Sequence, residues 1–355
     1  MEEIEGAERP VPNEAMEQTA ELLKSARREM AKRIVGQEEM IDGLFSALIA
    51  GGHILLEGVP GLAKTRAVKS LAEITGLVFK RIQFTPDLLP ADLTGTLVWE
   101  QSSGAFSVRR GPVFANLILA DEINRAPAKV QSALLEAMEE RQVTIGETSY
   151  PLPDPFFVLA TQNPIEHEGT YALPEAELDR FLLKLLIRYP SQEEEMRILD
   201  FAAPFGTAAG RKDAGAEKAD PAKPDAVSPH RVLDSASLEV LRAAADSIFI
   251  DEKIIRYITA ISAASRPLGQ ASRAGREGLY RYIAFGASPR ASLALYRCSR
   301  IRALFEGRPF VSPEDVKAAA YPVLRHRLVL SYEAEADGLD ADTVISRILA
   351  LVPVP

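Results

Sequence analysis

An eight-residue segment of the chain carries the residue types that bind phosphate groups. It lies between an apolar run at 53–57 and a helical pattern at 66–71, and consists of Gly58, Val59, Pro60, Gly61, Leu62, Ala63, Lys64 and Thr65. The order fits G-x-x-x-x-G-K-[ST], except that Ala63 replaces the last glycine. In such a loop the backbone N–H groups and the helix N-terminus converge on a polyphosphate, the Lys64 ammonium reaches the outer phosphates, and the Thr65 hydroxyl can contact Mg²⁺. A glycine turn beside a surface lysine is the alternative, but the flanking strand and helix favour phosphate binding.

Two carboxylates end the apolar run Leu117–Asp121. In a phosphate-binding fold of this kind Asp121 would hold the Mg²⁺ shell, and Glu122 could act as general base on the attacking water. A strand that ends in solvated acids is the alternative. Because the pair follows Lys64 on a later strand of the same predicted sheet, it favours a hydrolase over a plain phosphate binder or a small-molecule kinase.

Asn163 follows another apolar run, 156–160. Ligands of open α/β sheets bind at the carboxyl ends of the strands, so Asn163 would lie beside Asp121 and orient the hydrolytic water or contact the γ-phosphate. The competing interpretation is an Asn-Pro turn, and the two preceding motifs favour the functional one.

Two arginines are further candidates. Taken alone, Arg180 would pair with Glu177 or Asp179 on the surface. Arg290 follows a Ser-Pro pair that predicts a helix start, so it falls in the first turn, where a cation opposes the helix dipole at a cost of about 0.3–1 kcal/mol. An anionic ligand nearby would reverse that cost, which makes Arg290 a candidate phosphate sensor.

The elements that must position these residues alternate along the chain. Helical spacing of apolar residues predicts helices at 17–33, after Gly36, and at 127–141. Short apolar runs predict five strands, at 53–57, 78–84, 117–121, 156–161 and 182–188. Alternating strands and helices predict a three-layer α/β fold with a central parallel sheet, interrupted by β-hairpins at 96–109 and 143–152.

The composition changes after this region. We expect residues 1–16 to be flexible, 17–203 to form the nucleotide-binding α/β domain with the two hairpins as inserts, and 204–230 to be an Ala/Pro/Gly-rich linker or loop that buries too little apolar surface to order. Residues 231–355 have helical patterning throughout and predict a smaller all-α domain.

The overall composition excludes several classes of protein. The chain has 355 residues, of which 47% are hydrophobic, and one cysteine, Cys298, which fits a reducing compartment and a small core residue. The net charge of −9 argues against broad electrostatic capture of nucleic acid. No apolar run approaches the roughly 20 residues of a membrane span, and the acidic N-terminus lacks the character of a secretion signal. We therefore expect a cytoplasmic protein without a membrane span.

In this order and spacing the motifs resemble those of the MoxR family of AAA+ ATPases, over about residues 34–330. The matching segments are Ile34-Val35-Gly36-Gln37, 58–65, Gln83-Phe84-Thr85-Pro86-Asp87-Leu88-Leu89-Pro90-Ala91-Asp92, Ala120-Asp121-Glu122-Ile123-Asn124-Arg125, Ala160-Thr161-Gln162-Asn163-Pro164, Leu178-Asp179-Arg180-Phe181 and Ser288-Pro289-Arg290-Ala291. Alanine at position 63 agrees with this family, whereas the long biased segment 206–230 departs from it and leaves the positioning of the helical domain open.

The resemblance implies roles for single residues. Val35 and Gly36 would lie against the adenine of ATP, Asn163 would be sensor 1, and Arg290 sensor 2. Arg180 would be the arginine finger, which acts on the nucleotide of a neighbouring subunit. The resemblance thus implies a homo-oligomeric ring, usually a hexamer, with ATP and Mg²⁺ at each subunit boundary, an all-α lid domain at 231–355, and hairpins that match the helix-2 insert and the presensor-1 hairpin.

Members of this family are thought to act as chaperones, often beside von Willebrand factor A domain proteins, in metal insertion or the maturation of complexes. We expect a protein client of that kind. Two alternatives stay open: a nucleic-acid-directed AAA+ motor, disfavoured by the net charge, and a nucleotide-binding switch with little turnover. A GTP-binding switch lacks support, since no Asn-Lys-x-Asp segment is present.

Overall fold

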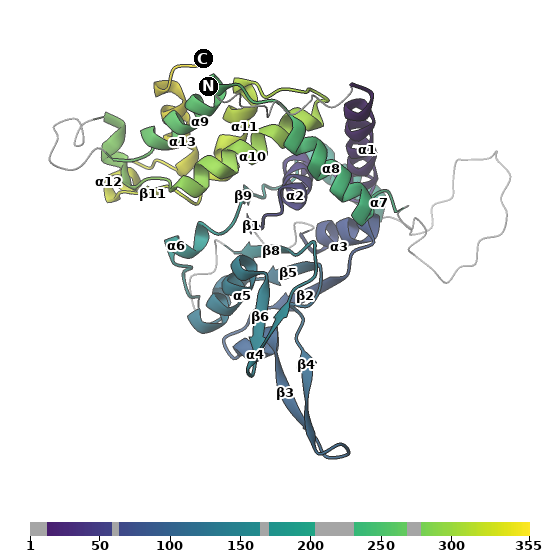
Figure 1. Cartoon of the computed structure of the whole chain (residues 1–355). Coiled ribbons are helices and arrows are strands. Elements are labelled where there is room, and N and C mark those ends of the chain that lie inside the picture. The colour runs from purple at the N-terminus through teal and green to yellow at the C-terminus, as the bar shows by residue number, and fades with distance from the viewer. Residues whose placement is uncertain (1–12, 59–63, 164–169, 203–230, 268–277) are drawn as a thin grey trace, which may run out of the picture.

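The computed structural model describes residues 13–58, 64–163, 170–202, 231–267 and 278–355 (Figure 1). The first helix, α1 (Asn13–Ala31), begins four residues before the helix expected from 17. The rest of the segment expected to be flexible, 1–12, and the whole of the expected linker, 204–230, lie outside the described residues.

The centre of the molecule is a sheet of five parallel strands in the order β2-β5-β8-β1-β9. These are the five predicted strands, shorter by one or two residues at some ends and, in β8, longer by one residue at its carboxyl end. Their bounds are β1 (Ile54–Glu57), β2 (Phe79–Gln83), β5 (Leu117–Asp121), β8 (Phe157–Gln162) and β9 (Leu183–Leu186). Apolar runs without polar alternation form these strands because both faces of the sheet are covered.

Successive residues of a strand point to opposite faces of the sheet, and each face has its own core. Leu55, Ile118 and Val158 pack on one face with residues of α5 (Ala128–Glu140) and of the short α4 (Pro90–Thr94). Ile54 and Leu117 pack on the other face, against α1, α2 (Glu38–Ala50) and α3 (Lys64–Thr75). The predicted three-layer arrangement with a central parallel sheet is therefore confirmed.

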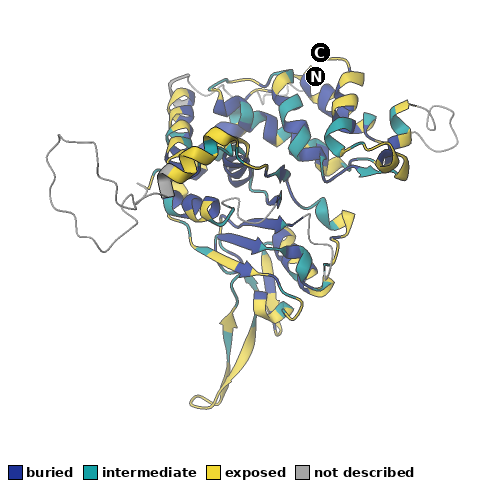
Figure 2. Cartoon of the chain, turned by 180° about the vertical axis from the view of Figure 1, so that it is seen from behind, coloured by how far each residue is buried: buried dark blue, intermediate teal, exposed yellow. Residues whose placement is uncertain are grey.

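The C-terminal part of the chain is mostly helical, as predicted, with one small two-stranded sheet that the sequence did not indicate. Its elements are α8 (Ser235–Ser247), α9 (Glu252–Ala264), η3 (Gly278–Tyr282), β10 (Ile283–Phe285), α10 (Pro289–Phe305), α11 (Pro313–Leu324), β11 (Val329–Leu330), α12 (Tyr332–Ala336) and α13 (Ala341–Leu351). Helix α7 (Gln192–Ala202) precedes them. Their apolar residues continue the core around α1 and α2 without interruption, so this part packs firmly on the α/β layers (Figure 2).

Both predicted hairpins are present. The first consists of β3 (Gly95–Glu100) and β4 (Ala105–Arg110). The second consists of β6 (Gln142–Ile145) and β7 (Thr148–Pro151), and it follows η1 (Ile123–Arg125) and α5. The β3–β4 hairpin projects far from the body (Figure 1). Near its tip Trp99 and Phe106 pack edge to face with ring centroids 5.0 Å apart, yet they remain 52% and 65% exposed. This cross-strand packing leaves apolar surface open to solvent.

Two further sequence interpretations can be compared with the structure. Cys298 is buried, and burial raises the pKa of its thiol to about 12, so it is a core residue without thiolate character. In the described part of the chain, no helix combines the length and the apolar character that a bilayer crossing requires.

The start of α11 carries a reciprocal cap formed by Ser312 and Asp315. The Ser312 hydroxyl accepts from the Asp315 N–H, and the Asp315 carboxylate accepts from the Ser312 N–H at 2.8 Å and from Arg308 at 2.6 and 2.9 Å. Burial by itself would raise the pKa of Asp315, but the hydrogen bonds from Arg308 and Ser312 outweigh it and hold this pKa below its ordinary 3.8.

We predict that Asp315→Asn lowers the free energy of unfolding by about 2 kcal/mol at pH 7, because charged hydrogen bonds are lost. Since the folded-state pKa is depressed, the charged carboxylate stabilises the fold above its ordinary pKa, and this stability is lost as pH falls through the folded-state value. Urea unfolding at pH 7 and pH 3 should therefore show a difference between wild type and variant that shrinks in acid. Asp246→Asn, with an exposed side chain, is the matched control; a pH-independent difference for Asp315→Asn would contradict the assignment.

Candidate functional site

The described ends of the phosphate-binding segment lie where β1 gives way to α3. Gly58 follows β1, and a Cβ atom there would lie 2.8 Å from the Cβ and 2.9 Å from the carbonyl oxygen of Ile187, so the chain admits no side chain at this position. Lys64 and Thr65 open α3. The remaining candidate residues of the segment lie outside the described residues; these are Val59, Pro60, Gly61, Leu62 and Ala63.

The Lys64 ammonium lies in the field of the predicted acidic pair. It donates a hydrogen bond to the Gly58 carbonyl oxygen. Burial lowers its pKa below the ordinary 10.5, while the carboxylates of Asp121, Glu122 and Glu57 act in the opposite direction. The structure therefore brings together the lysine and the two carboxylates that the sequence predicted to share a site.

Asp121 is held from two neighbouring strands. The buried Thr161 hydroxyl on β8 donates to its Oδ1 at 2.7 Å, and Arg81 on β2 donates to its Oδ2 at 2.6 Å through Nη2 and at 3.1 Å through Nε. These contacts fix the carboxylate at the carboxyl end of β5. Thr161 also accepts from the backbone N–H of Glu122 at 2.9 Å, so one hydroxyl orders both members of the acidic pair.

Glu122 has an unusual backbone conformation. Its φ of 57° lies in the left-handed region, which non-glycine residues seldom adopt and which costs on the order of 1–3 kcal/mol. Its carboxylate accepts from Gln83 Nε2 at 2.8 Å and pairs with Arg125 at 3.2 Å. The two carboxylates therefore have different partners, Gln83 and Arg125 for Glu122, but Thr161 and Arg81 for Asp121.

Asn163 follows β8 directly and is 7% exposed. Because β8 lies between β5 and β1 in the sheet, Asn163 stands at the carboxyl edge between the acidic pair and the Gly58 turn. The segment expected to contact adenine connects α1 to α2: Val35 is half-buried, and Gly36 has a φ of +68°, a conformation that favours glycine.

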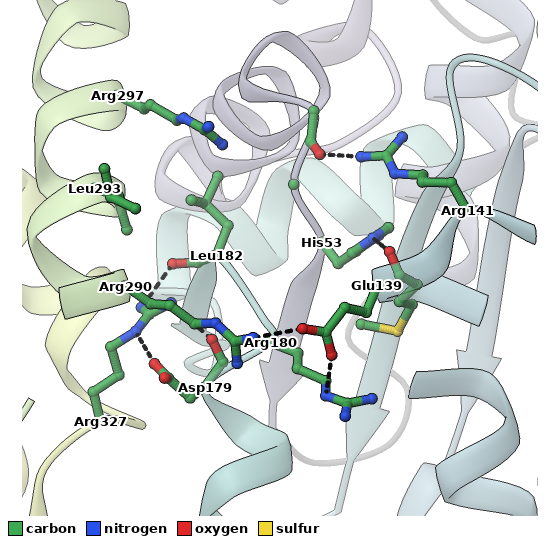
Figure 3. A pocket seen from close by; sticks show the side chains of 14 residues that line it. His53, Glu139, Arg141, Asp179, Arg180, Leu182, Arg290, Leu293, Arg297 and Arg327 are labelled. Atoms are coloured by element: carbon green, nitrogen blue, oxygen red, sulfur yellow. Dashed lines mark hydrogen bonds and ion pairs between the residues drawn. The ribbon is translucent and has the colours of Figure 1, made fainter. Parts of the chain in front are cut away.

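The two candidate arginines lie together, at the opposite edge of the sheet. Arg180 precedes β9 and Arg290 opens α10, and both line a pocket with Gly52 and His53, the residues that enter β1 (Figure 3). Since β1 and β9 are parallel, this is the amino edge, whereas Lys64 lies beyond the carboxyl edge. The four residues of β1 that separate the two edges span about 13 Å.

One carboxylate joins the two arginines. Glu139, at the end of α5, pairs with Arg180 Nε at 3.0 Å through Oε2 and with Arg290 Nη2 at 2.5 Å through Oε1 (Figure 3). The sequence-based alternative, in which Arg180 pairs with Glu177 or Asp179, does not describe this structure. Asp179 instead accepts hydrogen bonds from the helical part of the chain. Arg327 Nε donates to its Oδ1 and Ser288 Oγ donates to its Oδ2, both at 2.7 Å.

His53 supports the same edge and has no catalytic character. Its Nδ1 accepts from the Val158 N–H at 3.1 Å, which leaves Nε2 to donate to the Met138 carbonyl oxygen at 3.3 Å. Burial and the nearby Arg141 lower its pKa to about 3, so the ring is neutral at physiological pH. Within the described ranges no group of three or more His, Cys, Asp or Glu side chains is arranged to hold a metal ion.

Several residues of the site were missed by the sequence analysis. They contact its predicted members or hold the residue next to one of them, and are Arg81, Gln83, Thr161, Glu139, Asp179, Ser288 and Arg327. Gln83 and Arg81 alternate on one strand at the carboxyl edge, a pattern that could have indicated them. For Arg327, the available signal was a run of three consecutive basic residues, Arg325 to Arg327, after an apolar helix.

We predict that Thr161→Val lowers ATP hydrolysis by about tenfold to a hundredfold while ATP affinity changes little, because the Glu122 N–H and the Asp121 carboxylate both lose their shared hydroxyl. Steady-state turnover and equilibrium binding of a fluorescent ATP analogue measure the two effects. Thr144→Val, which removes an exposed hydroxyl contact to Ser149 in the second hairpin, is the control and should behave as wild type. Equal losses in both variants would contradict the role of Thr161.

Comparisons with known proteins identify the family of this chain. Residues 53–183 match the model of the ATPase family associated with various cellular activities (AAA), and residues 280–348 match the AAA lid domain. The chain is 44% identical to Chaperone MoxR1 of Mycobacterium tuberculosis over 94% of its length and 82% of that protein. It is 32% identical to Protein MoxR of Methylorubrum extorquens over 92% of its length and 94% of that protein.

A solved structure is similar over nearly the whole chain. A putative ATPase from Cytophaga hutchinsonii has a TM-score of 0.83 and 43% identity, and the match covers 96% of this chain and 97% of that one. Together with the parallel sheet, the Lys64–Asp121–Glu122 site and the helical lid, these matches show that the chain belongs to the MoxR family of AAA+ ATPases.

Proposed function

We propose that this chain hydrolyses ATP to ADP and phosphate with Mg²⁺, in a homo-oligomeric ring in which Arg180 and Arg290 of one subunit complete the nucleotide site of the next. The observation that carries the proposal is the division of the candidate residues between two edges of one sheet. Lys64, Asp121 and Glu122 share the carboxyl edge, and the two arginines share the amino edge.

At the carboxyl edge, segment 58–65 would hold the phosphates and Lys64 would contact the outer ones. The donors available for Mg²⁺ are the Thr65 hydroxyl and the Asp121 carboxylate, which suit a hard cation that also takes phosphate oxygens and water. Asp121 is already oriented by Thr161 and Arg81. Mg²⁺ bound there would neutralise charge on the phosphate oxygens, and Val35 and Gly36 would lie against the adenine.

Glu122 is the proposed general base. It would accept a proton from water as the water oxygen bonds to the γ-phosphorus and the bond from that phosphorus to the ADP oxygen breaks. Gln83 and Arg125 hold its carboxylate near the Lys64 ammonium, and Asn163 is suited to orient the water or contact the γ-phosphate. Each of these roles uses a side chain of the same edge.

The arginines act across a subunit boundary in this proposal. A chain whose two edges carry complementary halves of a site associates head to tail, and such heterologous contacts close into a ring when the rotation fits. The family resemblance makes a hexamer the expected ring. In related nucleotide hydrolases an arginine supplied from outside contributes roughly 10³–10⁵ in rate.

The turnover would serve the remodelling or maturation of a protein complex, including metal insertion, with a von Willebrand factor A domain protein as a possible partner class. Two facts support a protein client: the relative from Mycobacterium tuberculosis is named a chaperone, and the projecting hairpin exposes Trp99 and Phe106. The net charge of −9 does not favour nucleic acid as the client.

We predict that Glu122→Gln keeps ATP bound but lowers turnover by roughly two to four orders of magnitude, since an amide cannot take the proton from water. Retention of labelled ATP on the purified protein and release of phosphate measure the two effects, with EDTA added in parallel to remove Mg²⁺. Glu140→Gln, an exposed residue at the end of α5, serves as the control. Turnover at the wild-type rate in Glu122→Gln would refute the assigned base.

We predict that Arg180→Ala is inactive alone and regains activity when mixed with Glu122→Gln. In mixed rings the intact carboxyl edge of the first variant meets the intact arginine of the second. Random mixing at equal amounts would place such a boundary at about one quarter of all sites, which sets the expected recovery. Asn163→Ala mixed with Glu122→Gln should stay inactive, because both changes affect the same edge. No recovery with Arg180→Ala, in rings verified by mass measurement, would overturn the arrangement across the boundary.

A further inference from the structure

Asp179, the residue before Arg180, accepts hydrogen bonds from the lid through both of its carboxylate oxygens. Arg327 Nε donates to Asp179 Oδ1 at 2.7 Å, and the Ser288 hydroxyl donates to Oδ2 at 2.7 Å. Ser288 is also the N-cap of α10, where its oxygen accepts from the Arg290 N–H at 3.1 Å. Three hydrogen-bonding groups therefore connect the backbone of one candidate arginine to that of the other.

Arg327 gives this connection its rigidity. Its side chain is 3% exposed, and besides Asp179 it donates to the carbonyl oxygens of Phe181 at 2.6 Å and Leu182 at 3.1 Å. Burial lowers the pKa of this guanidinium, while the Asp179 carboxylate acts in the opposite direction. A buried cation needs its counter-ion and its hydrogen bonds, so Arg327 cannot release Asp179 without a large penalty.

The neighbouring residue ties the same segment to the lid a second time. The ring of the buried His326 contacts the Phe181 carbonyl oxygen through Nε2 at 2.9 Å. The loop that carries Arg180 is thus attached to the end of α11 from Asp179 to Leu182. By contrast, the side chain of Arg180 itself forms its ion pair with Glu139, at the end of α5 in the α/β domain.

We infer that Asp179 is a positioning residue that joins Arg180 and Arg290 into one unit, so that both meet the nucleotide of the neighbouring subunit at a fixed separation. This inference rests on the proposed function. Arg180 belongs to the α/β domain and Arg290 to the lid. Asp179, next to Arg180, crosses that boundary through Ser288 and Arg327, which both belong to the lid. A transition state that needs two cations is sensitive to their placement, since an error of 1 Å can cost about a hundredfold in rate.

The test is Asp179→Asn in the full chain, which keeps the side-chain volume and removes the charge. We expect kcat to fall by about tenfold to a hundredfold with little change in KM, because an interaction made in the transition state is disturbed. Ring assembly, followed by mass measurement with ATP and Mg²⁺, should match wild type. Mixing with Glu122→Gln should restore activity as it does for Arg180→Ala, because Asp179→Asn leaves the carboxyl edge intact.

The mixing result separates this role from general support of the fold. A residue that only stabilised the lid would lower activity without recovery in mixed rings. Wild-type kcat in Asp179→Asn, or a loss that mixing does not restore while Arg180→Ala is restored, would overturn the inference and leave the proposed function standing. Failure of the Arg180→Ala mixture would overturn both. Asp337→Asn, which removes a carboxylate paired with Arg281 elsewhere in the lid, is the matched control.

A second variant keeps the test decisive if Asp179→Asn does not fold. Ser288→Ala removes one of the two contacts to Asp179 and retains the buried pair with Arg327. We expect a loss in kcat of about three- to tenfold, as one hydrogen bond to a charged group is removed, again restored by mixing with Glu122→Gln. Unchanged kcat in Ser288→Ala would contradict the coupling of the two arginines.

Discussion

The common direction of the strands determines at which edge of the sheet each candidate site residue lies. All five strands of the sheet run parallel, so every loop that leaves the sheet does so at one edge and every loop that enters it does so at the other. Asp121 ends a strand and Gly58 and Asn163 follow strands, whereas Arg180 precedes one. An apolar layer some 13 Å deep separates the two groups. The chain therefore presents two different chemical surfaces, one that carries Asp121 and Glu122 beside Lys64, and another that is rich in guanidinium groups.

Local sequence patterns made the strands, the residues of the carboxyl edge, two helix starts and both hairpins predictable. Strands covered on both faces leave continuous apolar runs, and the residue after such a run lies at the carboxyl edge, which is how Asp121, Glu122 and Asn163 could be assigned from the sequence. Caps are local as well: Ser288 and Ser312 each bond within three residues of their own position, so the starts of α10 and α11 were predictable. Both hairpins are set by short turns between neighbouring segments.

The contacts that complete the site depend on packing between distant segments, which a single sequence does not encode locally. Glu139 and Arg290 are 151 residues apart, and Asp179 and Arg327 are 148 apart. The partner of Arg180 was predicted among its neighbours because an adjacent carboxylate is the nearest candidate. Asp179 is not available to it, since the lid supplies a buried guanidinium with a stronger need for that charge. Similarly, Arg81 and Thr161 reach Asp121 only through the strand order.

The continuous core between the lid and the α/β layers has a mechanical consequence. Leu295 and Ile301 of α10 belong to the same apolar cluster as Leu44 and Leu48 of α2 and Ile54 of β1. Swinging the lid away would expose this surface to water, which opposes independent hinge motion within a subunit. In the proposed ring, conformational change would then come from rotation of whole subunits relative to one another, with each subunit moving as one rigid body.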